Sequence, residues 1–185
     1  GTRIGSRVFA SSSDQRVANW QCELSLPAAV IQDFNGDGNA DVLYQSPNGL
    51  AVQGQAYNGS GRASGDPVAL DLGATDRQLL GIADMNGDGI NDYILRLLDG
   101  SNNYEVRIRN EQGAVTATRS YYPGTGDWRL VGTYDQNLDG YGDLIWQNNS
   151  TGRTSIFYLD ASGVCTSALT LVGSMSDYRI AAVGD

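Results

Sequence analysis

Short apolar segments alternate with clusters of glycine, asparagine, aspartate and serine along the whole chain. In one representative stretch the apolar segments cover residues 28–33, 41–46, 50–57 and 67–72. Segments of this length that are rich in Val, Ile, Leu and Tyr and bounded by turn residues predict β-strands. No segment of about ten or more residues carries a helical period. We therefore expect an all-β protein with almost no helix.

This alternation repeats at a constant interval. Three nine-residue segments align without gaps and begin at Asp33, Asp84 and Asp135. The repeat is thus 51 residues long (84 − 33 and 135 − 84), and an apolar segment lies on either side of each copy. Four predicted strands per repeat of about 40 to 50 residues are typical of β-propeller blades, which are four-stranded antiparallel sheets. A β-solenoid is the structural alternative, but its rungs need a much shorter period.

The repeat predicts a division of the chain into blades. We expect a partial blade over residues 1–27, blades over residues 28–77, 78–127 and 128–177, and the first strand of a further repeat over residues 178–185. About three and a half blades suggest a fragment of a larger ring. Its bare edges would be covered by self-association or by the rest of a parent protein, unless the two ends meet. The two cysteines, Cys22 and Cys165, are either buried thiols or a disulfide between the ends.

Each nine-residue segment follows the pattern D-x-N-x-D-G-x-x-D and is predicted to link the first two strands of a blade. Alternate side chains of a tightly curled loop point inward, so those at positions 1, 3 and 5 can converge on a cation. Glycine at position 6 permits a sharp reversal, position 7 offers its carbonyl, and the aspartate at position 9 closes the site. Calcium prefers six to eight such oxygen ligands. We predict three calcium ions, with ligands from Asp33, Asn35, Asp37, Asn39 and Asp41; Asp84, Asn86, Asp88, Ile90 and Asp92; and Asp135, Asn137, Asp139, Tyr141 and Asp143.

The loop pattern fits this kind of calcium loop better than metal-free turns or helical calcium motifs. Aspartate, asparagine and glycine also favour Asx-type turns without any metal, but three gapless copies at a constant period favour calcium. An EF-hand needs a glutamate at position 12, where this chain has Tyr44, Leu95 and Trp146. A dockerin would place a helix after the loop, whereas β-rich sequence follows here.

Composition and charge narrow the function classes. The formal net charge is −9, which matches the nine aspartates of the loops and makes a nucleic-acid partner unexpected. All basic residues are arginine and histidine is absent, so a Ser-His-Asp or Cys-His centre cannot form within this chain. The longest apolar run, residues 26–31, is too short to span a bilayer. We expect no membrane insertion.

With these motifs the chain resembles the FG-GAP/VCBS repeat family, which includes integrin α-subunit propellers and many bacterial secreted proteins. Residues 143–159, DLIWQNNSTGRTSIFYL, resemble the bacterial version in particular. The Phe-Gly and Gly-Ala-Pro elements that name the family are not evident, and position 3 is Asn rather than Asp. These departures weaken a kinship with integrins but not the calcium prediction. The resemblance implies a calcium-binding β-propeller at an extracellular or cell-surface location.

We expect a non-catalytic binding or adhesion module that recognises a glycan or a protein surface. The candidate contacts are aromatic residues on which a sugar could stack, with Arg119 and Arg129 nearby: Trp20, Tyr121, Tyr122 and Trp128. Packing between blades is the alternative role for each of them. A propeller polysaccharide lyase or hydrolase is the enzymatic alternative, but the three glutamates occupy unrelated positions of the repeat. A structural spacer beside a catalytic domain is the third possibility.

Overall fold

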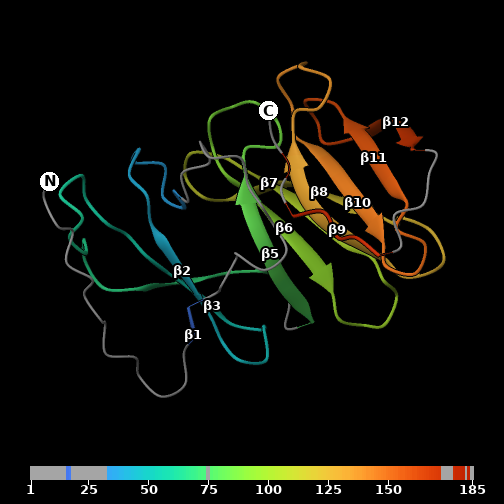
Figure 1. The fold of residues 1–185 in the computed structure, drawn as a ribbon. Coiled ribbons are helices and arrows are strands. Elements are labelled where there is room, and N and C mark those ends of the chain that lie inside the picture. Colours follow the sequence, from blue (N-terminus) through green and yellow to red (C-terminus); the bar gives the residue numbers. More distant parts are fainter. Residues whose placement is uncertain (1–15, 18–32, 74–75, 172–176, 182, 184–185) are drawn as a thin grey trace, which may run out of the picture.

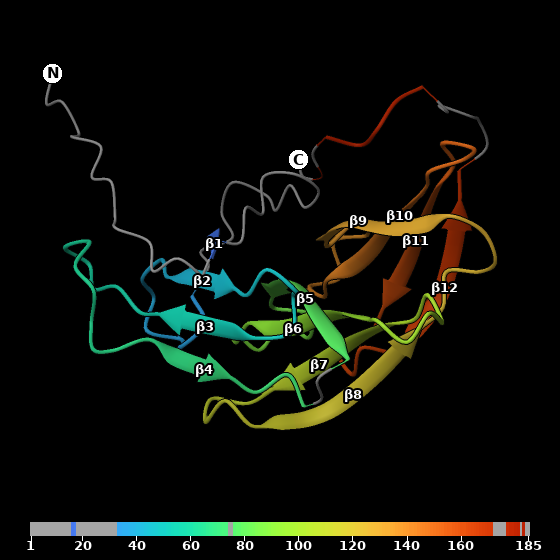
Figure 2. The same cartoon turned by 90° about the horizontal axis from the view of Figure 1, so that it is seen from below.

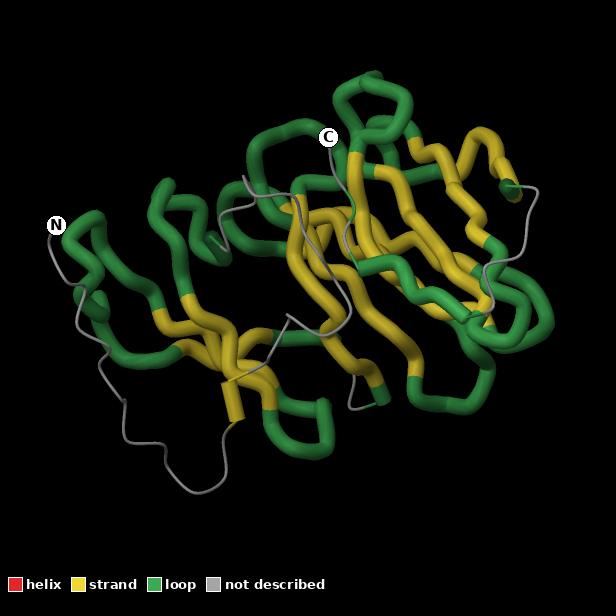
Figure 3. Tube along the Cα trace, in the orientation of Figure 1, coloured by secondary structure: helices red, strands yellow, loops and turns green. Residues whose placement is uncertain are grey.

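The computed structural model describes residues 16–17, 33–73, 76–171, 177–181 and 183. These residues form three four-stranded antiparallel sheets, which confirms the all-β prediction (Figure 1). Strands and loops account for everything described, and no helix is drawn (Figure 3). No helix in these ranges is therefore long and apolar enough to cross a membrane.

Within each sheet the strands are neighbours in chain order, so each sheet is an up-and-down blade. The first blade contains β1 (Arg16–Val17), β2 (Val42–Gln45), β3 (Val52–Gln55) and β4 (Val68–Leu70). The second contains β5 (Arg77–Ala83), β6 (Asp92–Leu97), β7 (Tyr104–Arg109) and β8 (Val115–Tyr121). The third contains β9 (Trp128–Tyr134), β10 (Asp143–Asn148), β11 (Thr154–Leu159) and β12 (Cys165–Thr170). The blades lie side by side in this order (Figure 2).

The first blade departs from the expected strand order. Its strands β2, β3 and β4 fall within the segments 41–46, 50–57 and 67–72. The segment 28–33, expected to be the first strand, lies outside the described residues except for Asp33. The described sheet instead pairs β1 with β2, with Arg16 opposite Gln45. The repeat spacing assigns β1 to the partial blade, so the blade bounds stay a prediction.

Of the two cysteines, only Cys165 lies within the described residues. Cys165 is exposed at the start of the outermost strand β12 and carries a free thiol. Cys22 lies outside the described residues. The structure thus shows neither a buried thiol nor a disulfide at Cys165.

In the second and third blades the inner strands are largely buried on both faces. The second blade lies between the other two, and Ile180 and Val183 pack against the other face of the third. Successive side chains of a strand point to opposite faces. In β10, Leu144 and Trp146 face the second blade, while Ile145 packs with Val131 and Ile156 on the other face. Every residue of β10 is buried, whereas every residue of β12 is exposed. This arrangement explains why β10 carries three consecutive apolar residues, Leu144, Ile145 and Trp146, rather than a strict alternation of apolar and polar residues.

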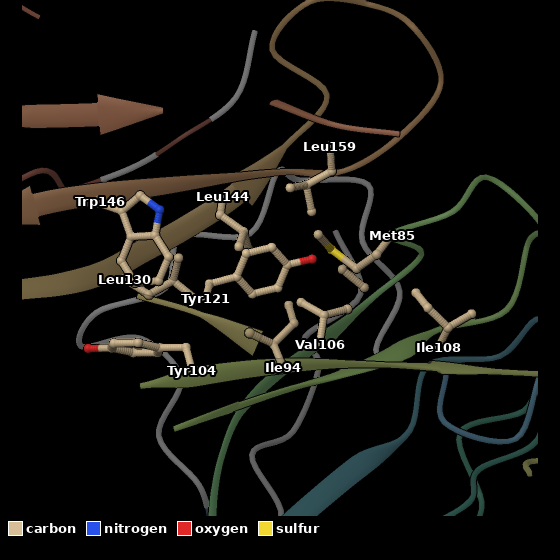
Figure 4. Packing of buried hydrophobic residues seen from close by; sticks show 11 residues of the cluster. Met85, Ile94, Tyr104, Val106, Ile108, Tyr121, Leu130, Leu144, Trp146 and Leu159 are labelled. Atoms are coloured by element: carbon tan, nitrogen blue, oxygen red, sulfur yellow. The ribbon is translucent and has the colours of Figure 1, made fainter. Parts of the chain in front are cut away.

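The largest core lies between the second and third blades. Figure 4 shows side chains from both blades meeting there: Met85, Ile94, Tyr104, Val106, Ile108, Tyr121, Leu130, Leu144, Trp146 and Leu159. The ring of Tyr104 meets Trp146 edge-on, with 4.7 Å between ring centroids. A second cluster joins the first two blades, with Phe34 and Leu43 packing against Leu79 and Ile82. Apolar contact between sheets, at about 25 cal/mol per Å² of buried surface, therefore holds the blades together.

A nearly buried ion network ties two non-adjacent strands of the second blade. The Arg77 guanidinium, at the start of β5, donates to Glu105 of β7 at 2.8 and 3.1 Å. Arg107 approaches the same carboxylate at 3.2 Å, and the Glu105 side chain is only 7% exposed. The hydrogen bonds from Arg77 hold the pKa of Glu105 below its ordinary value. The network bridges across β6, which lies between the two strands.

We predict that Glu105→Gln lowers the free energy of unfolding by about 2 kcal/mol at pH 7, because two half-buried arginines lose the negative charge that they share. The folded pKa is depressed, so this contribution is present above the unfolded pKa and is lost as pH falls through the folded pKa. Urea unfolding at several pH values measures it, with Glu111→Gln, an exposed turn position, as the matched control. A cost that persists unchanged at pH 3 would contradict the ionic origin.

Candidate metal centre

The three nine-residue loops occupy corresponding places in the fold. Loop one covers residues 33–41 and leads into β2, loop two covers residues 84–92 and connects β5 to β6, and loop three covers residues 135–143 and connects β9 to β10. In each loop the final aspartate lies at or just before the start of the second strand of its blade. The candidate site is therefore repeated at one end of three consecutive blades.

The first aspartate of each loop organises the turn that follows it. In loop one, Oδ1 of Asp33 accepts the backbone N–H groups of Gly36 and Asp37 at 2.7 and 3.2 Å, and Oδ2 accepts that of Gly38 at 2.6 Å. Loop two repeats all three bonds from Asp84, to Gly87, Asp88 and Gly89. Loop three repeats those to positions 5 and 6 from Asp135, to Asp139 and Gly140. The three loops thus curl around their first carboxylate in the same way.

The side chains at positions 3 and 5 are drawn toward each other. In loop one, Oδ1 of Asn35 accepts the backbone N–H of Asp37 at 2.9 Å, and its amide donates to the Asp37 carboxylate at 3.2 Å. Asp37 in turn accepts the backbone N–H of Asn39 at 2.9 Å, which lowers the pKa of its exposed carboxyl group. Loops two and three contain the same contacts. The side chains at positions 3 and 5 therefore meet in each loop, while the convergence of all the loop ligands on a cation stays a prediction.

The last aspartate of each loop is buried, unlike the exposed aspartate at position 5. Asp92 is 0% exposed, and its two oxygens accept the backbone N–H groups of Met85 at 3.0 Å and Arg109 at 2.8 Å. Asp41 and Asp143 form the equivalent pairs of bonds. Burial raises the pKa of Asp92 to about 7, and the nearby charges of Asp88 and Asp84 act in the same direction. This side chain ties the loop to the end of the third strand.

The donor set of the loops suits calcium. Each loop gathers carboxylate and amide oxygens, the hard ligands that this cation prefers. The three ion pairs among Asp76, Arg77, Glu105 and Arg107 involve no loop aspartate. A complete group of three carboxylate, thiol or imidazole side chains does not meet anywhere in the described ranges. The individual calcium ligands consequently stay a prediction, which the chemistry of the loops fits.

Neighbouring loops bond directly to each other. The Asn91 side chain of loop two donates to the backbone oxygen of Asp33 at 2.7 Å, and the backbone N–H of Gly142 in loop three donates to Met85 O at 3.2 Å. The buried Arg109 guanidinium adds bonds to Phe34 O at 3.4 Å and Asn91 O at 2.9 Å. The loops thus form a continuous row across the three blades.

Comparison with known proteins agrees with this repeated geometry. Residues 33–95, which contain loops one and two, match the model of the FG-GAP-like repeat. This part of the chain is similar to the FG-GAP-like repeat. The match confirms the family resemblance seen in the loop motif. No curated protein and no solved structure matches the chain significantly. Loop three lies beyond the matched range but has the same residue pattern and the same internal bonds.

The aromatic residues predicted to contact a ligand lie in different surroundings. Trp20 is outside the described residues. Tyr121 is buried, and its hydroxyl donates to the backbone oxygen of Gly163 in the next blade, so the structure gives it a packing role rather than a ligand surface. Tyr122 is exposed, and Trp128 is half-buried beside a cavity. The three described candidates, Tyr121, Tyr122 and Trp128, are thus a buried, an exposed and a half-buried residue.

Position 4 is where the three repeats differ most in backbone strain. Gly36 and Gly87 have φ values of 77° and 75° there, and Leu138 has the same left-handed conformation at 61°. A side chain disfavours this region by about 1–2 kcal/mol. Leu138 is 80% exposed, so no burial offsets the strain. The sequence signal for this departure is the replacement of glycine in an otherwise matching loop.

We predict that Asp92 stabilises the fold with or without calcium, whereas Asp88 contributes mainly through calcium. Asp92→Ala leaves two buried backbone N–H groups without acceptors and lowers the free energy of unfolding by about 2–4 kcal/mol with or without calcium. Asp88→Ala, at the exposed position 5 of the same loop, reduces mainly the calcium-dependent part. Urea unfolding in chelator and in calcium separates the two effects. Equal losses for both variants in chelator would contradict the assignment.

We also predict opposite outcomes for two substitutions at position 4. Gly87→Ala is destabilising, because φ is positive and a Cβ atom would lie 2.7 Å from the backbone oxygen of Gly140. Leu138→Gly removes the strain but adds chain entropy, so the free energy of unfolding is unchanged or rises by up to about 1 kcal/mol. Thermal melts of both variants test this, and a marked loss for Leu138→Gly would show that the Leu138 side chain makes a contact the fold requires.

Proposed function

We propose that the chain is a calcium-stabilised, non-catalytic binding module of an extracellular or cell-surface protein, which recognises a glycan or a protein surface. The observation that carries this proposal is the same hydrogen-bonded acidic loop at the same place in three consecutive blades. Turn formation alone requires neither three carboxylates per loop nor their repetition in three loops. A cation bound in each loop would explain both the number of carboxylates and their repetition.

Electrostatics supports the calcium part of this proposal. Like charges held a few ångströms apart repel, and burial of one of them adds a desolvation cost. In loop two these effects combine on Asp92, which is buried near Asp84 and Asp88. A calcium ion at the loop would offset both and would lock positions 1, 3 and 5 into one geometry. Calcium would thereby also stiffen the row of loops that joins the blades.

The positions of the glutamates favour binding over catalysis. Glu105 is held by two arginines, Arg77 and Arg107, within the second blade. Glu111 is exposed in the turn between β7 and β8, and Glu23 lies outside the described residues. A glycoside hydrolase of the usual kind needs two carboxyl groups about 5–10 Å apart around a substrate. Glu105 is occupied by arginines and Glu111 lies in an exposed turn, so neither glutamate supports the enzymatic alternative.

We predict that the folded chain binds three calcium ions. Each site should stabilise the fold by ~2.7 kcal/mol when calcium exceeds Kd a hundredfold, since the unfolded chain does not bind. Chelator should therefore lower the melting temperature by about 10 °C or more, and magnesium should restore it poorly because it demands a tighter octahedral site. Calorimetric titration gives the stoichiometry. An unchanged melt in chelator, or fewer than two ions bound, would refute the calcium proposal.

The binding role is tested separately with immobilised glycans and cell-surface proteins. The calcium-loaded chain should bind a subset of them and leave the length of a bound glycan unchanged. Shortening of a glycan by the isolated chain would contradict the non-catalytic assignment. Asp88→Ala is compared with the unaltered chain. It weakens the proposed calcium site of loop two and leaves the residues at the opposite end of the blades unchanged.

A further inference from the structure

A cavity of about 510 Å³ lies at the opposite end of the blades from the acidic loops. The end of β6, the start of β7 and the start of β9 border it, and residues 179–181 complete its wall. Three successive repeats thus contribute to one hollow. The C-terminal segment is held in place there, because Gln147 donates to Tyr178 O at 3.1 Å and accepts from the Ile180 N–H at 3.1 Å.

The cavity concentrates positive charge in an acidic protein. Its lining includes three arginines, Arg96, Arg129 and Arg179, and one carboxylate, Asp127. The chain as a whole has only twelve basic residues and a net charge of −9. Arginine presents a planar fork of donors that matches a carboxylate in a bidentate manner. The charge of the cavity therefore favours an anionic ligand.

Two aromatic residues supply the apolar part of the wall. Trp128 is half-buried against the core between the second and third blades, and Tyr104 is buried with its hydroxyl 3.4 Å from Trp128 O. The amide of Asn149 is fixed by a bond to Asp127 at 3.1 Å. The lining thus combines aromatic surface, cationic donors and a fixed pair of polar side chains. Sugars, which have both apolar C–H faces and hydroxyl groups, match such a mixture.

A change within the repeat accompanies this cavity. In the first and third blades, a glutamine near the end of the second strand bonds the segment that follows the blade, from Gln45 to Leu79 O in β5 at 3.2 Å and from Gln147 to Tyr178 O. The corresponding residue of the second blade is Arg96 (45 + 51), and its exposed side chain borders the cavity instead. Where the other two blades have a glutamine that hydrogen-bonds the following segment, the second blade therefore has an arginine whose charged group faces solvent.

We propose that this cavity binds a sugar that carries a carboxylate, such as a uronate unit of an acidic polysaccharide. Arg96 would pair with the carboxylate, and Arg129 and Arg179, which also donate to Gln147 and to Tyr178 O and Asn149 O, would add positive charge beside it. Trp128 would contact the sugar ring, and Asp127 would accept a hydrogen bond from a sugar hydroxyl group. An acidic peptide is the poorer match, since it brings further carboxylates toward Asp127 without donating hydroxyl groups. The inference rests on the proposed binding role and makes it specific.

Calorimetric titration of the calcium-loaded 185-residue chain, freed of excess calcium, tests the inference with three probes. These are a glucuronate-containing tetrasaccharide, a neutral tetrasaccharide of glucose and a tetra-aspartate peptide. We expect binding of the acidic sugar only, and a loss of about tenfold in Arg96→Gln, which removes one charged bidentate contact. Arg96→Gln introduces the residue that the other blades carry, so the variant should fold. Arg62→Ala, an exposed arginine of the first blade, is the matched control and should bind normally.

Equal binding of the neutral sugar, preference for the peptide, no binding of the acidic sugar, or full binding by Arg96→Gln would overturn the inference. Arg179→Ala provides a second variant on another wall of the cavity and should weaken binding to a similar extent. The calcium response of the melting temperature does not depend on Arg96. Failure of the carboxylate-sugar inference can therefore be distinguished from failure of the proposed calcium-stabilised module.

Discussion

A buried aspartate at the start of the second strand holds three segments of each blade in register. Asp92 receives one backbone N–H from its own loop and another from the end of β7, and Asp41 and Asp143 do the same in their blades. A carboxylate is costly to bury, so it is stable there only while its hydrogen bonds and any neighbouring cation compensate. The loops, the strand ends and the contacts between blades all depend on this side chain being satisfied.

Local pattern made much of the fold predictable from the sequence. The 51-residue period located the loops, and turn residues around β2, β3 and β4 marked their strands, because both features depend on residues close together in the chain. Contacts between distant residues were not predictable in the same way. No sequence signal indicated that Arg109 would bridge two loops, or that Tyr121 would bond Gly163 in the next blade instead of facing a ligand. The predicted first strand of the first blade, residues 28–33, lies outside the described residues except for Asp33, and β1 is the strand that pairs with β2 in the described part of that sheet.

The two ends of the blades differ in how much their residues vary from repeat to repeat. At one end the acidic loops keep the same pattern in all three blades, because each depends on the same set of backbone bonds. At the other end the residues vary from repeat to repeat, as the change from Gln45 to Arg96 illustrates. A scaffold that is constant at one end and variable at the other separates the residues that stabilise the fold from those free to acquire specificity.

The bonds between neighbouring loops give the array a direction. Asn91 and Gly142, both at position 8, donate to the backbone oxygen of the loop before them, and neither bond runs the other way. The earlier repeat contributes a backbone carbonyl to each bond, and every residue has one. The later repeat contributes the donor, which is a side-chain amide at Asn91 and a backbone N–H at Gly142. The bond between loops one and two is therefore sensitive to the side chain at position 8, whereas the bond between loops two and three tolerates any residue there that keeps its backbone N–H.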